Sequence, residues 1–304
     1  MTLSIIIVNW NVKALLEKCL ESIRRETKDL DYEVIVVDNA SQDGSREFLN
    51  RIMNNESGIM DRKRKLVKII LNNRNLGFSR ANNQALKISR GDFILFLNPD
   101  TEIFPNSLHL ALNFMRQNKS CGILGGQLLD NKNQTQFSVR RFPGLWSQIL
   151  VLLKVQHWWP QCPILKKYFV WSFNYGQVQT VDQVMGAFLL TRRETMKQLG
   201  GFDEKFFLWF EDVDLCWRAK QAKWSVIYHP DVKVKHYSHQ SFLQVLSYPK
   251  QKIYNQSLIY FFRKNYSLWS ALILSIFVPL SLFLALVVQP FHAFLKSYYE
   301  FRKF

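Results

Sequence analysis

Apolar runs of strand length alternate with stretches of helical periodicity along the N-terminal part of the chain. Apolar residues spaced by three and four appear at 15–23 and 80–89, and the polar segment NASQDGS precedes another helix. The expected strands lie at 3–8, 32–38, 67–71 and 92–100. This alternation predicts an α/β fold, with a mostly parallel sheet and helices on both of its faces.

Polar residues follow each of these predicted strands. In sheets of this kind, ligands bind at the carboxyl ends of the strands. Those ends are the segments 9–11, 38–43, 72–77 and 98–100, and they are rich in acids and amides. The sequence therefore predicts a ligand-binding site at this edge of the sheet.

The segment 136–183 is less regular and contains many aromatic residues. Apolar side chains share one side of a predicted helix, and two tryptophans follow; these residues are Leu145, Ile149, Leu152, Leu153, Trp158 and Trp159. The stretch 166–173 mixes bases with aromatics. Two interpretations remain open: a surface that faces a membrane or an amphiphilic acceptor, and an ordinary core helix with an aromatic end.

An uncharged apolar run at 268–288 predicts a membrane-associated helix, so we expect an N-terminal domain at 1–240 followed by a membrane-associated region at 241–304. Its Leu, Ile, Phe and Val side chains each favour insertion by about 0.3–0.6 kcal/mol, and its length matches a hydrocarbon core of about 30 Å. Pro279 favours a kink, so a bent helix lying in one leaflet is an alternative to a full span. Bases flank both ends and leave the orientation open; they are Arg263, Lys264, Lys296, Arg302 and Lys303.

The 304 residues carry a formal net charge of +16, which indicates an anionic partner. Nucleic acid, an anionic membrane and a phosphorylated substrate are the candidates, and a solvated basic face is the alternative. The bases are spread along the chain, and the dense cluster at 62–65 is expected to be a solvated loop. Helix-turn-helix, zinc-finger and RNP-like motifs are absent from the sequence, so we do not expect a nucleic-acid partner.

The cysteines and the N-terminus exclude further classes. The four cysteines form no C-x-x-C pair, which disfavours a zinc site or a disulfide framework and favours a reducing compartment. We expect Cys19 and Cys216 to be buried apolar residues. The apolar run 3–8 is too short for a secretory signal and lacks a basic leader. The G-x-G-x-x-G of a nicotinamide dehydrogenase is absent after the first strand.

A set of motifs in a fixed order resembles glycosyltransferase family 2. The motifs are SIIIVNWN, VIVVDNASQDGS, NNRNLGFSRANNQAL, FILFLNPDTEI, VMGAFLLTRRE and GGFDEKFFLWFEDVDLCWR. They span residues 2–241 and are most similar to the bacterial rhamnosyltransferase-like members. The resemblance implies a GT-A (Rossmann-like) fold, a nucleoside-diphosphate sugar as donor and a saccharide hydroxyl as acceptor.

The resemblance also implies where the donor binds. Asp38 is expected to accept a hydrogen bond from the nucleotide base or ribose, although a helix N-cap is its structural alternative. Trp10 is expected to lie against the base, with Asn75 and Gly77 on its other side. Gly77, like Gly44, also suits a turn. Gly186 and its neighbour Ala187 are expected to allow close approach of donor or acceptor.

A divalent cation is implied by the segment Asn98-Pro99-Asp100. The family usually has D-x-D here, so Asp100 is the expected ligand for Mg²⁺ or Mn²⁺, with the diphosphate and waters completing the shell. A strand-terminating turn is the alternative. His236 matches the family's late histidine that approaches the metal, whereas His229 and His239 are less well placed.

The acidic cluster in FEDVD supplies the expected catalytic base. By resemblance Asp212 removes the acceptor proton, and Glu211 raises its pKa or binds acceptor hydroxyls. Asp214 is expected to cap the helix that follows. Direct displacement predicts inversion at the anomeric carbon. Arg192 and Arg193 pair either with phosphate or with surface acids.

Three functions remain in view. We expect a non-processive transferase acting on a lipid-linked saccharide at the cytoplasmic face of the inner membrane, because the Q-x-x-R-W motif and multiple spans of processive synthases are absent from the sequence. A polyprenyl-phosphate sugar synthase is the enzymatic alternative. A membrane- or nucleic-acid-binding basic protein with a degenerate transferase fold is the non-enzymatic one.

Overall fold

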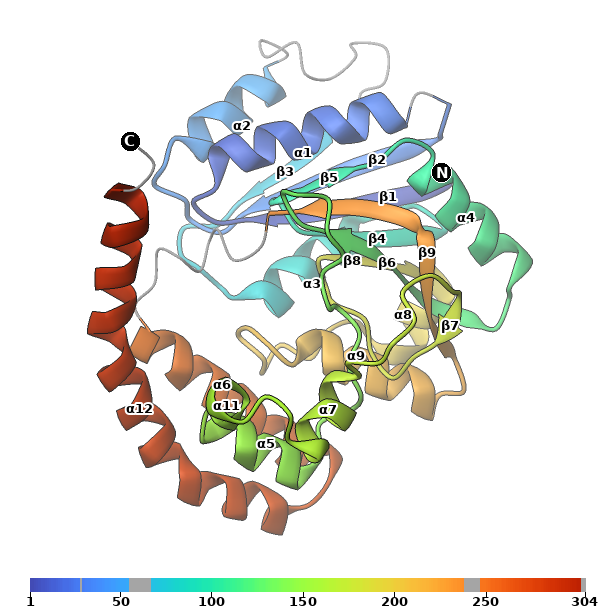
Figure 1. Cartoon of the computed structure of the whole chain (residues 1–304). Helices are drawn as coiled ribbons and strands as arrows, with labels where there is room; N and C mark the ends of the chain where they lie inside the picture. The colour runs from blue at the N-terminus through green and yellow to red at the C-terminus, as the bar shows by residue number, and fades with distance from the viewer. Residues whose placement is uncertain (28, 55–66, 238–246, 302–304) are drawn as a thin grey trace.

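The computed structural model describes residues 1–27, 29–54, 67–237 and 247–301, and Figure 1 shows a sheet with helices on both sides and a helical lobe below it. The described strands form one sheet in the order β3-β2-β1-β4-β8-β6-β9-β5, with β7 paired to β9. Their bounds are β1 Leu3–Asn9, β2 Tyr32–Asp38, β3 Val67–Leu71, β4 Phe93–Leu97, β5 Thr101–Ile103, β6 Cys121–Leu129, β7 Gln179–Thr180, β8 Phe188–Arg192 and β9 Ser225–His236.

The first half of the sheet is parallel, as predicted. β1 pairs in parallel with β2 and β4, and β2 with β3, so their carboxyl ends meet at one edge. The connecting helices are α1 Lys13–Glu26, α2 Ser45–Met53 and α3 Phe78–Ile88. In the pairing of β1 with β2, Asn9 stands opposite Asp38. The predicted convergence of polar strand ends is therefore present in the structure.

The second half of the sheet is mixed rather than parallel. β8 runs antiparallel to both β4 and β6, whereas β9 runs parallel to β6 and antiparallel to β5. The prediction of a mostly parallel sheet thus describes the first half only, because its strand–helix alternation comes from the N-terminal segments. The short pairing of β5 with β9 sets Thr101 opposite His236, and so brings Asp100 close to that histidine.

Two apolar cores cover the two faces of the sheet. Residues of β1 and β2 alternate between them: Ile5 and Val34 join one core and Ile6 and Ile35 the other. α1, α2 and α4 (Ser107–Gln117) pack on the first face, and α3, α8 (Arg193–Leu199) and α9 (Glu211–Gln221) on the second. The α/β class with helices on both faces is confirmed. All four cysteines are buried and free.

The lower lobe in Figure 1 consists of helices from two distant parts of the chain. They are α5 Leu145–Leu152, α6 Val155–Trp158, α7 Pro163–Phe169, α11 Ser247–Asn265 and α12 Leu268–Phe301. Ile149, Leu258 and Leu274 pack together with residues that precede α9. The division into a catalytic domain at 1–240 and a membrane region at 241–304 remains a prediction.

The helices of the 136–183 segment have one buried side and one exposed side, and a membrane- or acceptor-facing role of the exposed side stays a prediction. Ile149 and Leu152 on α5 are buried in the lobe, whereas the side chains of Trp146 and Trp158 are each 69% exposed. The segment is therefore neither wholly a core element nor wholly a surface element. The basic cluster 62–65 and His239 lie outside the described residues.

The long C-terminal helix has the composition of a membrane segment. Its part Leu268–Val287 has a mean hydropathy of 2.5 and, within the described residues, is the one helix long and apolar enough to cross a bilayer. α12 continues through Pro279 and follows an arc in Figure 1, as a proline inside a helix leads one to expect. Trp269 and Ile276 are 76% and 74% exposed. The membrane association of this helix, as a full span or as a bent helix in one leaflet, stays a prediction.

Candidate active site

Asp38 lies at the end of β2 and holds the adjacent loop. Its buried carboxylate accepts hydrogen bonds from Asn9 Nδ2 and from the backbone N–H of Ser41, both at 3.0 Å. The alternative role as a helix N-cap is wrong, because α2 begins at Ser45 after Gly44. Trp10 follows Asn9 and is half-buried at the same strand end.

Asn75 and Gly77 belong to a loop that touches the segment before α9. Asn75 Oδ1 accepts hydrogen bonds from Asn39 Nδ2 and from the Gly77 N–H, both at 2.9 Å. Gly77 has φ +84°, and a Cβ there would lie 2.6 Å from the Phe207 carbonyl oxygen. Gly77 therefore serves the turn and a close backbone contact. The loop borders a cavity of about 490 Å³ lined by Arg74, Asn75, Leu76, Arg80, Glu204, Lys205 and Phe207.

The structure brings the two predicted metal ligands together. Asp100 Oδ1 and His236 Nε2 are 3.5 Å apart, and both side chains are buried. The backbone reinforces this approach, since the Tyr237 N–H donates to the Asp100 carbonyl at 2.9 Å. Asp100 and His236 are far apart in the sequence, and the antiparallel pairing of β5 with β9 brings them together.

Gln136, which the sequence did not single out, fixes the tautomer of neutral His236. Gln136 Nε2 donates to the His236 carbonyl oxygen at 2.7 Å, so its Oε1 is the atom that faces His236 Nδ1 at 2.9 Å. An amide oxygen only accepts, so Nδ1 carries the proton and Nε2 directs its lone pair toward Asp100. Metal-binding histidines are commonly held by such an outer partner.

An oxygen–nitrogen pair of this kind fits a divalent cation only with help from a substrate. Among the described residues, no group of three or more His, Cys, Asp or Glu side chains could hold a metal ion. Mg²⁺ commonly takes one or two carboxylates and completes its shell with phosphates and waters. Asp100 and His236 are compatible with that mode of binding.

Asp212 and Glu211 begin α9 after a strained turn. Trp209 and Phe210 have φ of 64° and 67°, in the left-handed region that bulky residues avoid. Asp212 Oδ2 accepts the Gly186 N–H at 2.9 Å, and a Cβ on Gly186 would lie 3.5 Å from the same oxygen. Gly186 thus positions the carboxylate of Asp212 through its backbone.

The two carboxylates differ in their ionisation. Burial and the neighbouring Asp212 carboxylate raise the pKa of Glu211 well above its usual range, and Glu211 Oε2 is buried with no hydrogen-bond partner among the described residues. Burial also raises the pKa of Asp212, but the N–H groups of Gly186 and Val213 and the charge of Arg140 oppose this. Asp212 therefore ionises first, while Glu211 keeps its proton.

Arg140 is a second residue that the sequence did not single out. Its guanidinium lies over the Phe169 ring, 5.4 Å from the centroid, and its charge lowers the pKa of Asp212. It lies in an irregular segment that pairs with Gln183 through an isolated bridge. The basic and aromatic pattern around it was visible, but its proximity to Asp212 depends on tertiary structure.

The segment 186–187 connects the two centres. The Asn98 N–H donates to the Ala187 carbonyl at 3.1 Å, while the Gly186 N–H donates to Asp212. Gly186 and Ala187 thus form hydrogen bonds to both centres: Ala187 to the strand end near Asp100, and Gly186 to Asp212 at the start of α9. Residues far apart in the sequence are brought to the same edge of the sheet.

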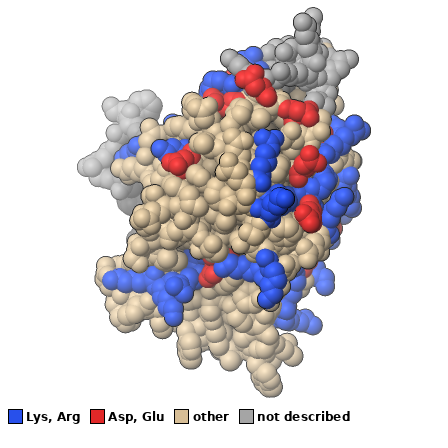
Figure 2. All heavy atoms as spheres, turned by 90° about the vertical axis from the view of Figure 1, so that its right-hand side faces the viewer, with Lys and Arg blue, Asp and Glu red and all other residues tan. Residues whose placement is uncertain are grey.

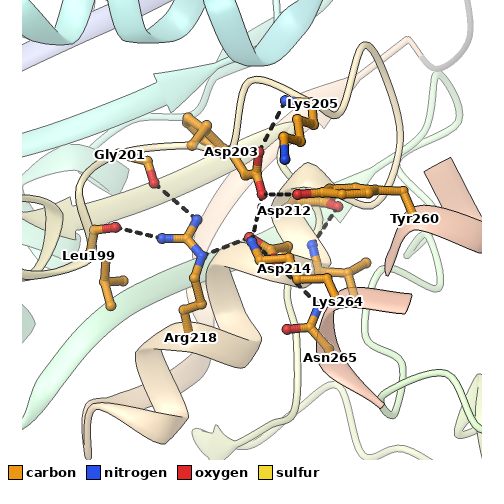
Figure 3. Close-up of polar contacts among 12 residues, drawn as sticks. Leu199, Gly201, Asp203, Lys205, Asp212, Asp214, Arg218, Tyr260, Lys264 and Asn265 are labelled. Carbon is orange, nitrogen blue, oxygen red and sulfur yellow. Dashed lines mark hydrogen bonds and ion pairs between the residues drawn. The ribbon is translucent and has the colours of Figure 1, made fainter. Parts of the chain in front are cut away.

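Asp214 does not cap α9 but joins a buried network, shown in Figure 3. Its carboxylate contacts Arg218 Nε and Lys264 Nζ, each at 2.7 Å. Lys264 also bonds to Asp203 at 2.7 Å. Since Lys264 belongs to α11, the network connects α9 to the C-terminal helical lobe.

The prediction that Arg192 and Arg193 pair with phosphate or surface acids is wrong. Arg192 donates to the backbone carbonyls of Cys121 and Asn118 at 2.9 and 2.8 Å. Arg193 donates to the Gly91 carbonyl at 2.6 Å. These guanidinium groups join the end of β8 and the start of α8 to the segments at the start of β6 and before β4, and serve the fold.

A family model described as glycosyl transferase family 2 matches residues 4–175, more than half of the chain. The chain belongs to this family. A second model, glycosyl transferase family group 2, matches residues 93–299 and so includes most of the helical lobe. This protein is therefore a glycosyltransferase, and the non-enzymatic alternative is set aside.

Two bacterial relatives of this glycosyltransferase match over most of their length. The N-acetylglucosaminyl-diphospho-decaprenol L-rhamnosyltransferase of Mycobacterium tuberculosis is 26% identical over 79% of this chain and 77% of the relative. The rhamnosyltransferase WbbL of Escherichia coli is 27% identical over 77% of this chain and 83% of the relative.

Solved structures show that the fold is of the GT-A type. The mannosyltransferase PcManGT of Pyrobaculum calidifontis, in complex with GDP-Man and Mn²⁺, has a TM-score of 0.57 and 16% identity, covering 99% of this chain and 80% of that one. GalNAc-T7 with UDP, GalNAc and Mn²⁺ also has a TM-score of 0.57, at 18% identity. The match covers 78% of this chain and 44% of the GalNAc-T7 chain.

Proposed function

We propose that this glycosyltransferase moves one sugar from a nucleoside diphosphate to a hydroxyl of a lipid-linked saccharide, with inversion at the anomeric carbon. One observation carries the proposal: an ionisable Asp212 carboxylate lies at the same sheet edge as the Asp100–His236 pair, connected to it through 186–187. The arrangement places the base for the acceptor hydroxyl beside the proposed binding site for the donor diphosphate.

The donor binds at the carboxyl ends of the parallel strands. Trp10, Asn75 and the loop held by Asp38 form the nucleotide side of the site, and the cavity beside Asn75 has room for part of the ligand. Asp100 and His236 would hold Mg²⁺ or Mn²⁺, and a bound cation would neutralise charge on the diphosphate. The Mn²⁺ in the two structural neighbours supports this choice of ions.

Asp212 acts as the general base. Its ionised carboxylate takes the proton of the acceptor hydroxyl while that oxygen attacks the anomeric carbon. The bond from the anomeric carbon to the diphosphate breaks on the opposite side, so the nucleoside diphosphate leaves and the configuration inverts. Glu211, held protonated by burial, adds no second charge near the leaving group and can donate a hydrogen bond to an acceptor oxygen.

The relatives favour a rhamnosyl donor and an acceptor joined to a polyprenyl carrier. Both bacterial relatives are named as rhamnosyltransferases, and one name specifies a diphospho-decaprenol acceptor. This chain would therefore act in cell-envelope polysaccharide biosynthesis, at the cytoplasmic face of the inner membrane. The apolar helix Leu268–Val287 supports contact with that membrane.

The surface of the lobe supports an anionic bilayer as the attachment site. Figure 2 shows Lys and Arg in a band across the molecule, and below this band lies surface with few charged side chains. That uncharged end corresponds in height to the lower lobe of Figure 1. Apolar and aromatic side chains that enter the interface below a basic band match the way amphipathic elements bind anionic membranes.

Donor binding tests the proposal first. The detergent-solubilised protein is heated with a panel of UDP-, GDP- and dTDP-sugars, with and without Mn²⁺, and its melting temperature is recorded. We expect a metal-dependent rise with one nucleotide, because a ligand that binds only the native state stabilises it. Folded protein that responds to none of these donors contradicts a nucleotide-sugar site.

A further inference from the structure

A second cavity lies between α6, α11 and α12, beside the loop that precedes the catalytic helix. Its volume is about 330 Å³, within the range of small-molecule sites of about 300–1,000 Å³. Its basic lining residues are Lys154, His157 and Lys250. The remaining wall includes the aromatic side chains of Trp209 and Tyr254 and the apolar Leu284 of α12.

The lysines of this cavity are held in an unusual environment for cations. Burial lowers the pKa of Lys154 and of Lys250. Lys154 Nζ donates to the neutral amide oxygen of Gln251, and no ion pair with a carboxylate is found for it among the described residues. Lys154 is partly buried, and withdrawing a cation from water without a counter-charge is costly, so Lys154 would stabilise an anion bound here.

Aromatic contacts connect this cavity to the active site. Trp209 and Phe210 pack on Tyr254, with ring centroids 6.1 and 5.4 Å apart. Phe210 directly precedes Glu211, so one side of the strained turn faces the cavity and the other leads into the catalytic helix. A ligand in the cavity would therefore lie next to the acceptor side of the reaction.

The cavity also opens on the apolar helix. Leu284 and Ala285 of α12 form part of its wall, and the neighbouring Phe283 is exposed. A ligand suited to both surroundings has an anionic head and a long hydrocarbon tail. The head meets the lysines, and the tail lies along α12, in contact with lipid.

We propose that this cavity binds the diphosphate of a polyprenyl-linked acceptor, with Lys154 and Lys250 as its charged contacts. The inference rests on the proposed function for the identity of the saccharide, but not for the binding of the diphosphate itself. The cavity lies beside Trp209, in the strained turn that precedes Glu211 and Asp212. This position favours the acceptor as its ligand, because the headgroup of a bulk anionic phospholipid takes no part in the reaction.

Direct binding of farnesyl diphosphate, a short isoprenyl diphosphate, tests the site without any turnover. The full-length protein in detergent is titrated and its tryptophan fluorescence followed. We expect saturable binding that weakens about tenfold in Lys154→Gln and in Lys250→Gln, the loss typical of a charged hydrogen bond. Lys167→Gln, which changes an exposed lysine on α7, is the matched control. Absence of binding to the wild type overturns the proposal, as does equal binding by all variants.

Kinetics then separate the possible sources of the anion. The wild type and the Lys154→Gln variant are compared on a polyprenyl-diphosphate saccharide and on an alkyl glycoside of the same saccharide that lacks the diphosphate. We expect KM to rise about tenfold for the first acceptor only, with kcat and the donor KM unchanged.

An equal loss on both acceptors contradicts the proposal. So does weaker binding to phosphatidylglycerol vesicles with unchanged acceptor KM, because that result makes the cavity a phospholipid site. If the wild type binds farnesyl diphosphate but transfers no sugar, the proposed function fails and the diphosphate site stands.

Discussion

The sheet half and the helical lobe differ in how they surround their polar and apolar side chains. At the sheet edge, the buried carboxylate of Asp38 accepts hydrogen bonds from nearby backbone and amide groups, and the central strands β1, β2 and β4 are almost wholly buried. In the lobe, Trp269 and Ile276 are exposed, and the partly buried Lys154 donates to a neutral amide oxygen. Apolar side chains exposed along one face of a helix are typical of a surface that contacts another apolar phase. The contrast therefore supports the proposal that the lobe contacts lipid through α12.

The largest expected effect is on the catalytic carboxylate of the sheet edge. Asp212→Asn should lower kcat by about 10²–10⁴-fold, because general-base catalysis is lost. Its amide oxygen can still accept one of the two backbone hydrogen bonds, from Gly186 or from Val213. Initial rates with saturating donor and acceptor measure this. Asp92→Asn, at an exposed site, is the control and should keep normal turnover. Near-normal turnover in Asp212→Asn would refute its role as base.

A charge on the exposed face of α12 should produce the next largest effect. Ile276→Asp should weaken partitioning into anionic vesicles about a hundredfold, because a carboxylate in the hydrocarbon core costs about 2.5–3.5 kcal/mol. Flotation with vesicles measures the bound fraction. Leu110→Asp, on α4 of the sheet half, introduces the same group at an exposed leucine and should change little. Equal partitioning of both variants would remove α12 from the membrane contact.

The outer partner of His236 predicts a smaller effect on the metal. Gln136→Leu should raise the Mn²⁺ concentration needed for half-maximal activity about 10–100-fold, because the imidazole loses the acceptor that fixes its tautomer. Saturating Mn²⁺ should restore most of kcat. Gln134→Leu, at an exposed site in the same segment, is the control. A loss of kcat that no metal concentration restores contradicts this role.

The smallest expected effect is a displacement of the pH profile. Activity needs ionised Asp212, whose pKa is raised by burial, so the rate should fall with decreasing pH at a value above the usual aspartate range of about 3.9. Arg140 lowers that pKa, so Arg140→Gln should move the acid limb to higher pH by up to about one unit. The pH dependence of kcat/KM measures it, with the exposed neighbour change Arg141→Gln as control. A limb that stays in place or moves to lower pH contradicts the assignment.

The same contrast explains what the sequence allowed us to predict. The strands and helices of the parallel half follow from local periodicity, and Asp38, Asp100 and Asp212 come from motifs near strand or helix ends. Gln136 and Arg140 were missed because their partners lie far along the chain, across irregular segments that give no periodic signal. Their functions depend on the position of β9 and α9.

Three incorrect expectations have a common physical cause. Asp214 near a helix start suggested a cap, and Arg192 and Arg193 suggested anion binding, but each finds buried tertiary partners instead. The local sequence shows that a residue is charged, but it does not show which group that residue contacts in the folded protein. In this fold, several of the facing groups are backbone carbonyls of loops around β6 and β8.

The anomeric configuration of the product tests the central claim most directly. The protein is incubated with Mn²⁺, a polyprenyl-diphosphate saccharide and each nucleoside-diphosphate sugar of the panel, and the new linkage is examined by NMR. The account predicts that one donor is consumed, only when the metal is present, and that the transferred sugar has the configuration opposite to that in the donor. A product that retains the donor configuration would contradict direct displacement with Asp212 as the base.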